Sequence, residues 1–132
     1  MYLIDTSIFS YLFRGDPIAQ RYADDLAPDA HLFLSVQTIG ELRLGAEQRQ
    51  WGEQRRARLR EFMASFTVLP ITEATTACYA EVITASRRAG RPLQVADGWI
   101  VATAKQYGLT LVAHDKDMRV AETIGISIIC RS

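Results

Sequence analysis

The sequence has little cysteine, no long apolar run and no net charge. No apolar stretch approaches the roughly 20 residues of a transmembrane helix, and the N-terminus lacks the basic and apolar regions of a signal peptide. Cys78 and Cys130 have neither metal-ligand nor redox spacing, so we expect two free thiols. These absences favour a cytoplasmic protein with no membrane partner.

Lysine is also scarce. The 15 basic residues balance 15 acidic ones, so no overall field attracts nucleic acid. Lys105 and Lys116 are the two lysines, and every other basic residue is an arginine. Guanidinium groups bind phosphates and carboxylates through paired hydrogen bonds. The arginine bias is therefore compatible with a phosphate-bearing substrate despite the neutral total.

A chain of 132 residues is long enough for one hydrophobic core, and no linker or repeat divides it, so we expect a single domain over 1–132. The pattern predicts strands at 2–5, 31–35, 67–70, 110–113 and 127–129. It predicts helices at 17–26, 35–47, 72–88 and 94–108, with an arginine-rich helix within 50–66. Alternation of short strands and helices predicts an α/β fold, a three-layer sandwich whose central parallel sheet of about five strands is flanked by helices.

Two acidic residues lie where predicted strands end. Asp5 follows the apolar run YLI, and Asp115 comes two residues after the strand at 110–113. A buried unpaired charge is costly, so Asp5 either caps a helix or belongs to a site that needs its charge. Because functional groups gather at the carboxyl ends of parallel strands, we expect both carboxylates at the same edge of the sheet.

Two further acids lie near helix starts. Glu41 lies in SVQTIGELRLG, and Asp97 is the one acid of the apolar helix LQVADGWIVATA. Each acid also has an ordinary structural interpretation. Asp5 is a candidate N-cap, Asp97 a partner of the helix dipole, and Glu41 a solvated residue. Asp115 and Asp117 are candidate turn residues.

The joint pattern of these acids favours a site. Converging carboxylates without cations repel one another and raise one another's pKa. A divalent cation relieves this repulsion, and Mg²⁺ typically binds one or two carboxylates, several waters and a substrate phosphate. The sequence therefore favours metal-dependent phosphodiester chemistry.

The segments LIDTSIFSYL, SVQTIGELRLG and ADGWIVATAKQYGLTLVAHDKDM resemble the ordered motifs of the PIN-domain nucleases, specifically the VapC-type toxins of bacterial type II toxin–antitoxin pairs. The resemblance runs from residue 2 to about 129. The strand ending in Asp-Thr-Ser matches at Asp5, the Glu-Leu pair within a helix matches at Glu41, and the Asp before a small residue matches at Asp97.

The fourth motif departs from the family pattern. Ala113 stands where the family usually has Thr or Ser, and Met118 stands where it has an aromatic residue. Asp115 or Asp117 therefore completes the acidic set. Asp115 is favoured because it lies closer to the strand end.

The resemblance implies an endoribonuclease that depends on Mg²⁺, with Mn²⁺ as a substitute, and that cleaves structured RNA such as tRNA or rRNA. It implies that Asp5 and Asp97 bind the metal directly or through water, and that Glu41 and Asp115 complete the catalytic set. Thr6 and Ser7 are expected either to support a ligand carboxylate or to cap a helix.

The resemblance also implies a homodimer and inhibition by a cognate VapB-like antitoxin that reaches the acidic cleft with an Arg or Lys. Of the two helices within 37–66, one is expected to face the core and the other to be partly exposed. Their proposed apolar contact residues are Leu44, Trp51, Leu59, Phe62 and Phe66. Candidate RNA contacts are Arg14, Arg43 and Lys116.

The arginine run has three interpretations: a solvated helix face, a partner contact or an RNA contact. It comprises Arg55, Arg56, Arg58 and Arg60. His114 is expected to be incidental to the chemistry.

Other families fit less well. A haloacid-dehalogenase-type phosphatase needs a second Asp two residues after the first, where this chain has Ser7. A response-regulator receiver needs paired acids near the first strand end. A catalytically inactive PIN-like domain that binds RNA or acts as a scaffold is the alternative function, and the intact set of four acids disfavours it.

Overall fold

The computed structural model describes residues 1–132 and contains one five-stranded parallel sheet in the order β3-β2-β1-β4-β5. Leu3 lies opposite Phe33 on one side and Leu111 on the other. The strands are β1 (Tyr2–Ile4), β2 (Leu32–Ser35), β3 (Thr67–Leu69), β4 (Thr110–Ala113) and β5 (Ile128–Cys130). The predicted parallel sheet is confirmed, with each strand within two residues of its expected bounds.

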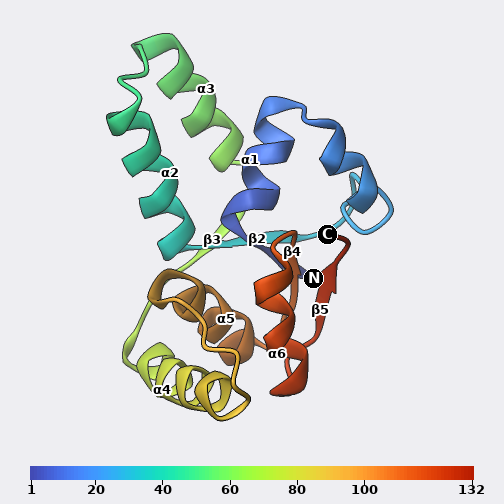
Figure 1. The fold of residues 1–132 in the computed structure, drawn as a ribbon. Helices are drawn as coiled ribbons and strands as arrows, with labels where there is room; N and C mark the ends of the chain where they lie inside the picture. The colour runs from blue at the N-terminus through green and yellow to red at the C-terminus, as the bar shows by residue number, and fades with distance from the viewer.

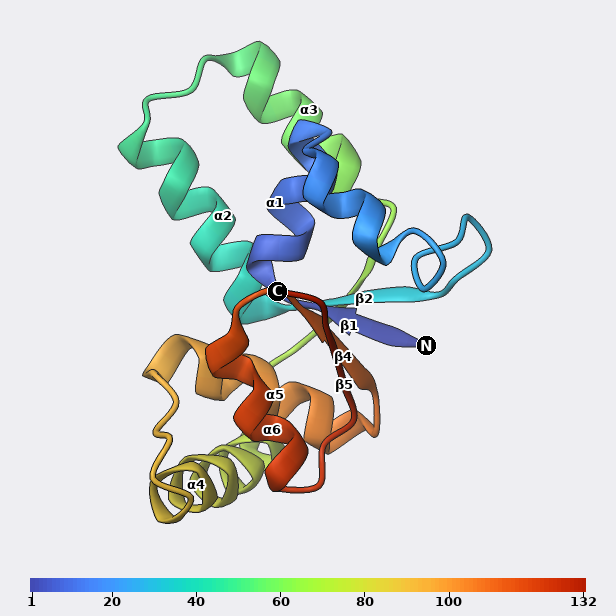
Figure 2. The ribbon, with the colours of Figure 1, turned by 45° about the vertical axis from the view of Figure 1, so that its right-hand side comes forward.

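Helices cover both faces of this sheet, which confirms the three-layer architecture (Figures 1 and 2). The α-helices are α1 (Thr6–Arg14), α2 (Val36–Gln48), α3 (Glu53–Met63), α4 (Glu73–Arg88), α5 (Val95–Tyr107) and α6 (Val120–Thr123). Two 3₁₀ helices are η1 (Pro17–Tyr22) and η2 (Lys116–Arg119). Helices α1, α2 and α3 lie on one face, and α4, α5 and α6 on the other. None of the helices has the length and apolar character needed to cross a membrane.

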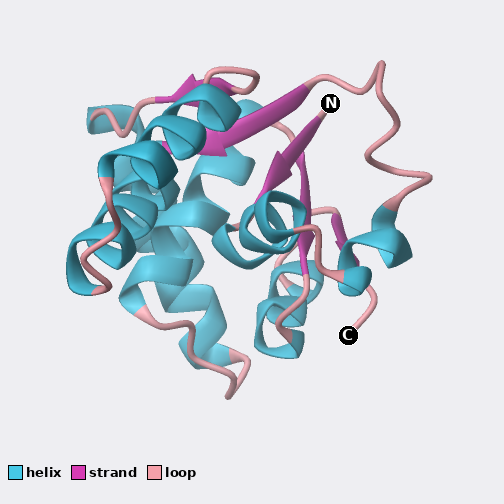
Figure 3. Cartoon of the chain, turned by 90° about the horizontal axis from the view of Figure 1, so that it is seen from above, coloured by secondary structure: helices cyan, strands magenta, loops and turns pink.

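Each face of the sheet has its own hydrophobic core. Ile4 and Val112 point toward α1 and α3, where Phe9 is fully buried. Leu3 and Leu111 point to the opposite face and pack with residues of α4, α5 and α6. Because a parallel sheet is buried on both faces, its strands are continuous apolar runs, as in YLI and TLVA. Seen from above, the strands of the sheet fan out instead of running exactly parallel (Figure 3).

The structure corrects the expected helix at 17–26. That segment forms only the short 3₁₀ helix η1, and an unpredicted helix, α1, precedes it. The sequence of α1, TSIFSYLFR, is rich in β-branched and aromatic residues with modest helix propensity. Burial of Ile8 and Phe9, together with a cap at each end, stabilises it. The pair Asp16-Pro17 does start a helix, but a 3₁₀ one.

The expected contact surface on α2 and α3 is wrong for two of its five residues. Leu59 is 3% exposed and Phe66 is 9% exposed, so both belong to the core beneath α1. Trp51 and Phe62 are half-buried and pack against the same core. Leu44 alone of the five is exposed. The expectation that only one of the two helices faces the core is wrong. Residues of both α2 and α3 pack in one core with α1, and each helix keeps one exposed face.

Close packing of α5 on α4 depends on Gly98. A Cβ atom there would lie 2.6 Å from Cδ1 of Ile83 and 3.1 Å from Cε2 of Tyr79. Gly40 is exposed on α2, and a Cβ atom there would have no neighbouring atom within 4 Å. The same substitution by alanine can therefore be compared at two helical positions, one crowded (Gly98) and one open (Gly40).

We predict that Gly98→Ala lowers the free energy of unfolding by about 1 kcal/mol, because the clash outweighs the gain in helix propensity. Gly40→Ala should raise it by about 0.5–1 kcal/mol, because only the propensity changes. Urea unfolding followed by circular dichroism measures both. Equal stabilisation by the two substitutions would contradict the close helix contact.

Candidate active site

The site begins at the centre of the sheet. The backbone N–H of Asp5 donates to the carbonyl of Val112 over 3.0 Å, so the ends of β1 and β4 are tied together. The chain order reverses here, since β2 lies on one side of β1 and β4 on the other. In open parallel sheets this switch point opens a crevice at the carboxyl ends of the strands. Asp5 thus lies where such folds bind ligands.

The carboxylate of Asp5 is 5% exposed and is held by α1. Its Oδ1 accepts hydrogen bonds from the N–H of Ile8 and the hydroxyl of Ser7, each at 2.9 Å, and its Oδ2 lies 3.0 Å from the same hydroxyl. Asp5 is therefore the N-cap of α1 as well as a candidate site residue. Burial raises its pKa to about 7; the charges of Asp97 and Asp115 add to this rise, and the two hydrogen-bond donors oppose it.

Asp97 lies in the first turn of α5 and is half-buried. Burial is the largest cause that raises its pKa, followed by the charges of Asp115, Glu41 and Asp117. Most of α5 is buried. Asp97 lies at its start, close enough to the end of β1 for its charge to raise the pKa of Asp5.

Glu41 joins the acidic group from α2. Its carboxylate accepts a short hydrogen bond from the hydroxyl of Thr6, which also lies 3.1 Å from the hydroxyl of Thr38. The link across α1 and α2 fixes the side chain of Glu41. Thr6 therefore supports an acidic residue, and Asp5 rather than Thr6 or Ser7 is the helix cap.

Asp115 follows β4 and is exposed. Its Oδ1 accepts from the N–H of Asp117 over 2.9 Å, so it caps η2. The charge of Asp115 raises the pKa of both Asp5 and Asp97, whereas the charge of Asp117 acts on Asp97 alone. Asp115 is thus the more central of the two acids left open by the sequence.

The acidic group contains no cation from the chain. The five ion pairs of the protein involve other carboxylates, so Asp5 and its acidic neighbours repel one another without compensation. As the side chains lie, no group of three His, Cys, Asp or Glu residues could by itself hold a metal ion. Mg²⁺ needs only one or two protein carboxylates and completes its shell with water. The donor chemistry of Asp5 and Asp97 fits such an ion.

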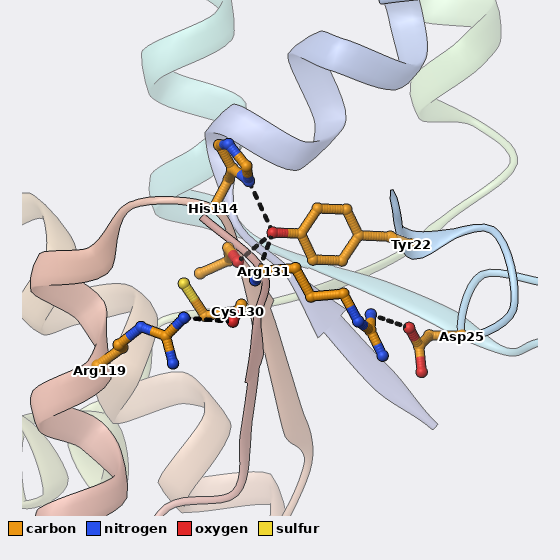
Figure 4. A network of polar contacts seen from close by, with 7 residues as sticks. Tyr22, Asp25, His114, Arg119, Cys130 and Arg131 are labelled. Atoms are coloured by element: carbon orange, nitrogen blue, oxygen red, sulfur yellow. Dashed lines mark hydrogen bonds and ion pairs between the residues drawn. The ribbon is translucent and has the colours of Figure 1, made fainter. Parts of the chain in front are cut away.

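A polar network that the sequence did not reveal supports the end of β4 (Figure 4). Tyr22 is fully buried, and its hydroxyl donates to the carbonyl of Ala113 over 3.2 Å and accepts from the N–H of Arg131 over 2.8 Å. The same hydroxyl lies 2.7 Å from Nδ1 of His114. Tyr22 thus ties the strand end before Asp115 to the C-terminal residues. No local signal marks Tyr22, because its partners are more than 90 residues away.

Comparison with known families agrees with this arrangement. The model of the PIN domain matches residues 2–123. The chain belongs to the PIN domain family.

Named relatives of this PIN domain span nearly the same length. The chain is 31% identical to "Toxin FitB" of Neisseria gonorrhoeae over 134 residues, covering 96% of each protein. It is 32% identical to "Ribonuclease VapC4" of Mycobacterium tuberculosis, covering 87% of this chain and 86% of the relative. A crystal structure of VapBC-5 from Mycobacterium tuberculosis, a member of the VapBC family of toxin-antitoxin systems, matches 97% of this chain and 94% of that one with a TM-score of 0.70 and 28% identity.

The raised pKa of Asp5 predicts how the stability of the metal-free PIN domain depends on pH. The pKa is about 7 in the folded state against an ordinary value of 3.8, so the folded state retains a proton that the unfolded state loses. Stability should therefore fall as pH rises from about 4 to about 7 and then level off. Asp5→Asn keeps the cap and removes the charge. In EDTA at pH 8 it should be more stable than the wild type by a few kcal/mol.

This gain should shrink as pH falls and vanish below about pH 4, where Asp5 is protonated in both the folded and the unfolded states. Urea unfolding of both proteins between pH 5 and pH 8 measures the difference. Asp29→Asn removes an exposed carboxylate and serves as the control, with no comparable pH dependence expected. A stability difference that shrinks as pH rises would contradict the burial of a repelled carboxylate.

Proposed function

We propose that this PIN domain is an endoribonuclease that acts as the toxin of a type II toxin–antitoxin pair. The observation that carries the proposal is the buried carboxylate of Asp5, with its raised pKa, among acids that have no cationic partner. The names of the two relatives, a ribonuclease and a toxin, support the activity and the biological role. We further propose that the functional unit is a single domain over 1–132.

The proposed cofactor is Mg²⁺, with Mn²⁺ as a substitute. Asp5 and Asp97 would hold it, directly or through water. When bound, the metal supplies a more acidic water and neutralises the charge that develops on the phosphate. Glu41, fixed by Thr6, and Asp115, fixed by its own turn, complete the acidic pocket and orient the attacking water. The substrate is structured RNA, such as tRNA or rRNA.

We predict that Asp97→Asn lowers the rate of RNA cleavage by about 100-fold or more, because it removes a ligand charge and keeps the side-chain volume. Asp117→Asn should keep most of the activity, since the charge of Asp117 raises the pKa of Asp97 less than those of Asp115 and Glu41 do and is not among the causes that raise the pKa of Asp5. Cleavage of total tRNA with Mg²⁺, stopped by excess EDTA, measures both variants. Full activity of Asp97→Asn would exclude the metal assignment, and an inert wild-type protein that still binds RNA would favour the inactive RNA-binding alternative.

The proposed partners besides RNA are a cognate antitoxin and a second copy of the chain. The crystal structure of a VapBC-family member supports a toxin–antitoxin assembly. Val36, Leu44 and Val68 are between 42% and 56% exposed, so α2 and β3 present apolar side chains that one chain leaves uncovered. A partner surface would bury them.

We predict that the purified chain has about twice the monomer mass of 14.8 kDa in light scattering. Co-expression with the product of the adjacent small gene should yield a complex that does not cleave tRNA. The antitoxin should reach the acidic cleft with an Arg or Lys, whose charge competes with the cation. A stable monomer at micromolar concentration whose activity the partner does not change would contradict this assembly.

A further inference from the structure

The hydroxyl of Tyr22 takes the place of one hydrogen bond between β4 and β5. Ala113 is paired with Cys130 in the parallel register, so the carbonyl of Ala113 would ordinarily accept from the N–H of the next residue, Arg131. Instead, this N–H donates to the Tyr22 hydroxyl over 2.8 Å, and the hydroxyl donates to the carbonyl of Ala113 over 3.2 Å (Figure 4). A side chain from η1 therefore bridges two strand ends that would otherwise pair directly.

The three partners of this hydroxyl use all of its hydrogen-bonding capacity. A tyrosine hydroxyl has one proton to donate and two lone pairs that accept. The proton goes to the carbonyl of Ala113, and the N–H of Arg131 occupies one lone pair. The third partner, Nδ1 of His114 at 2.7 Å, must then donate, which places the proton of the neutral imidazole on Nδ1. Burial raises the pKa of Tyr22 above its ordinary value of 10.0, so the hydroxyl keeps the proton that it donates.

The sheet does not require this insertion. A direct hydrogen bond between Arg131 and Ala113 would satisfy both backbone groups without a buried phenol. What the inserted hydroxyl adds is the bond to His114, the residue directly before Asp115. The ring of His114 is also held at its edges, since its centre lies 5.5 Å from that of Tyr11 and 5.8 Å from that of Tyr22, with the rings nearly perpendicular.

The segment that carries Asp115 is therefore fixed mainly by its surroundings. Tyr22 binds the carbonyl two residues before Asp115 and the side chain one residue before it. The thiol of Cys130 donates to the carbonyl of Asp115 itself, with Sγ and O 3.6 Å apart. The carboxylate of Asp115 makes only a local turn, by accepting from the N–H of Asp117. Its direction thus follows the backbone of residues 113–115.

Resting on the proposed function, we propose that Tyr22 is a positioning residue of the nuclease and acts on the reaction through Asp115. Its hydroxyl forms no hydrogen bond with any of the acids, so it takes no part in the chemistry itself. A group that orients an attacking water works only at a defined distance and angle, and a small displacement costs much of the rate. Loss of the hydroxyl frees the end of β4 and lets Asp115 move, whereas Glu41 and Asp97 are held by α2 and α5.

The test is a double-mutant cycle on the cleavage of total tRNA with Mg²⁺. Tyr22→Phe keeps the buried ring and removes the hydroxyl, so it should lower kcat about tenfold and leave KM nearly unchanged. Asp115→Asn should lower kcat at least as much. The double variant should be no slower than Asp115→Asn alone, because one effect acts through the other. Tyr107→Phe removes a hydroxyl from a side chain that is 39% exposed, at the end of α5 far from Asp97, and should change neither constant.

A purely structural role of Tyr22 gives a different result. Losses of kcat that multiply in the double variant would overturn the proposal, and so would an unchanged kcat in Tyr22→Phe. His114→Ala removes one bond of the hydroxyl from a half-buried side chain, so it provides a second variant should Tyr22→Phe fail to fold. It should lower kcat in the same direction and have no effect in the Asp115→Asn background. His114→Asn, whose amide can donate in place of Nδ1, should restore most of the activity.

A measurement without RNA separates this proposal from the proposed function. The amide of Asp117, which donates to the carboxylate of Asp115, should exchange its hydrogen about tenfold faster in Tyr22→Phe than in the wild type. An unchanged exchange rate would overturn the positioning of Asp115 by Tyr22, whether or not the protein cleaves RNA. Absence of tRNA cleavage by the wild type, with faster exchange in the variant, would overturn the nuclease and leave the contact between Tyr22 and Asp115 intact. Thermal unfolding by circular dichroism establishes that each variant is folded.

Discussion

The buried carboxylate of Asp5 is the constraint around which the site is arranged. It ends β1, caps α1 and lies among other acids, so one side chain connects the sheet, the first helix and the chemistry. Only two local donors, from Ser7 and Ile8, stabilise its charged form, and they do not offset burial. The fold thus retains an electrostatic cost that a bound cation would relieve.

The parallel sheet brings acidic residues from distant sequence positions close enough for their charges to interact. Asp5 and Asp115 follow adjacent strands, and the helices after β2 and before β4 bring Glu41 and Asp97 to the same edge. Two hydrophobic cores, one on each face, hold these helices at fixed positions. Asp97 precedes Gly98, the residue at which α5 packs closely against α4, so a site residue and a core contact are neighbours on this helix.

The arginines divide by their partners. Arg56 joins α2 to α3 through the carbonyls of Trp51 and Ala46, and Arg131 joins the C-terminus to the loop that carries Asp25. The side chains of Arg49 and Arg55 form no such bonds, and they line a cavity between α1, α2 and α3 that Glu41 also lines. A chain with zero net charge can therefore still carry unpaired arginines and unpaired carboxylates on its surface.

The sequence by itself determined the parallel α/β sheet, because short continuous apolar runs alternate with segments of helical periodicity. It also led to the prediction of the four acids as one site, because a charge next to a core strand or on an apolar helix is costly unless it is used. It did not determine α1, whose weak helix propensity is overridden by burial of Ile8 and Phe9. Only the tertiary structure decided that Leu59 and Phe66 are core residues and that Tyr22 supports the end of β4. Both depend on contacts between segments far apart in the chain, and a local pattern carries no information about which distant surface will cover it.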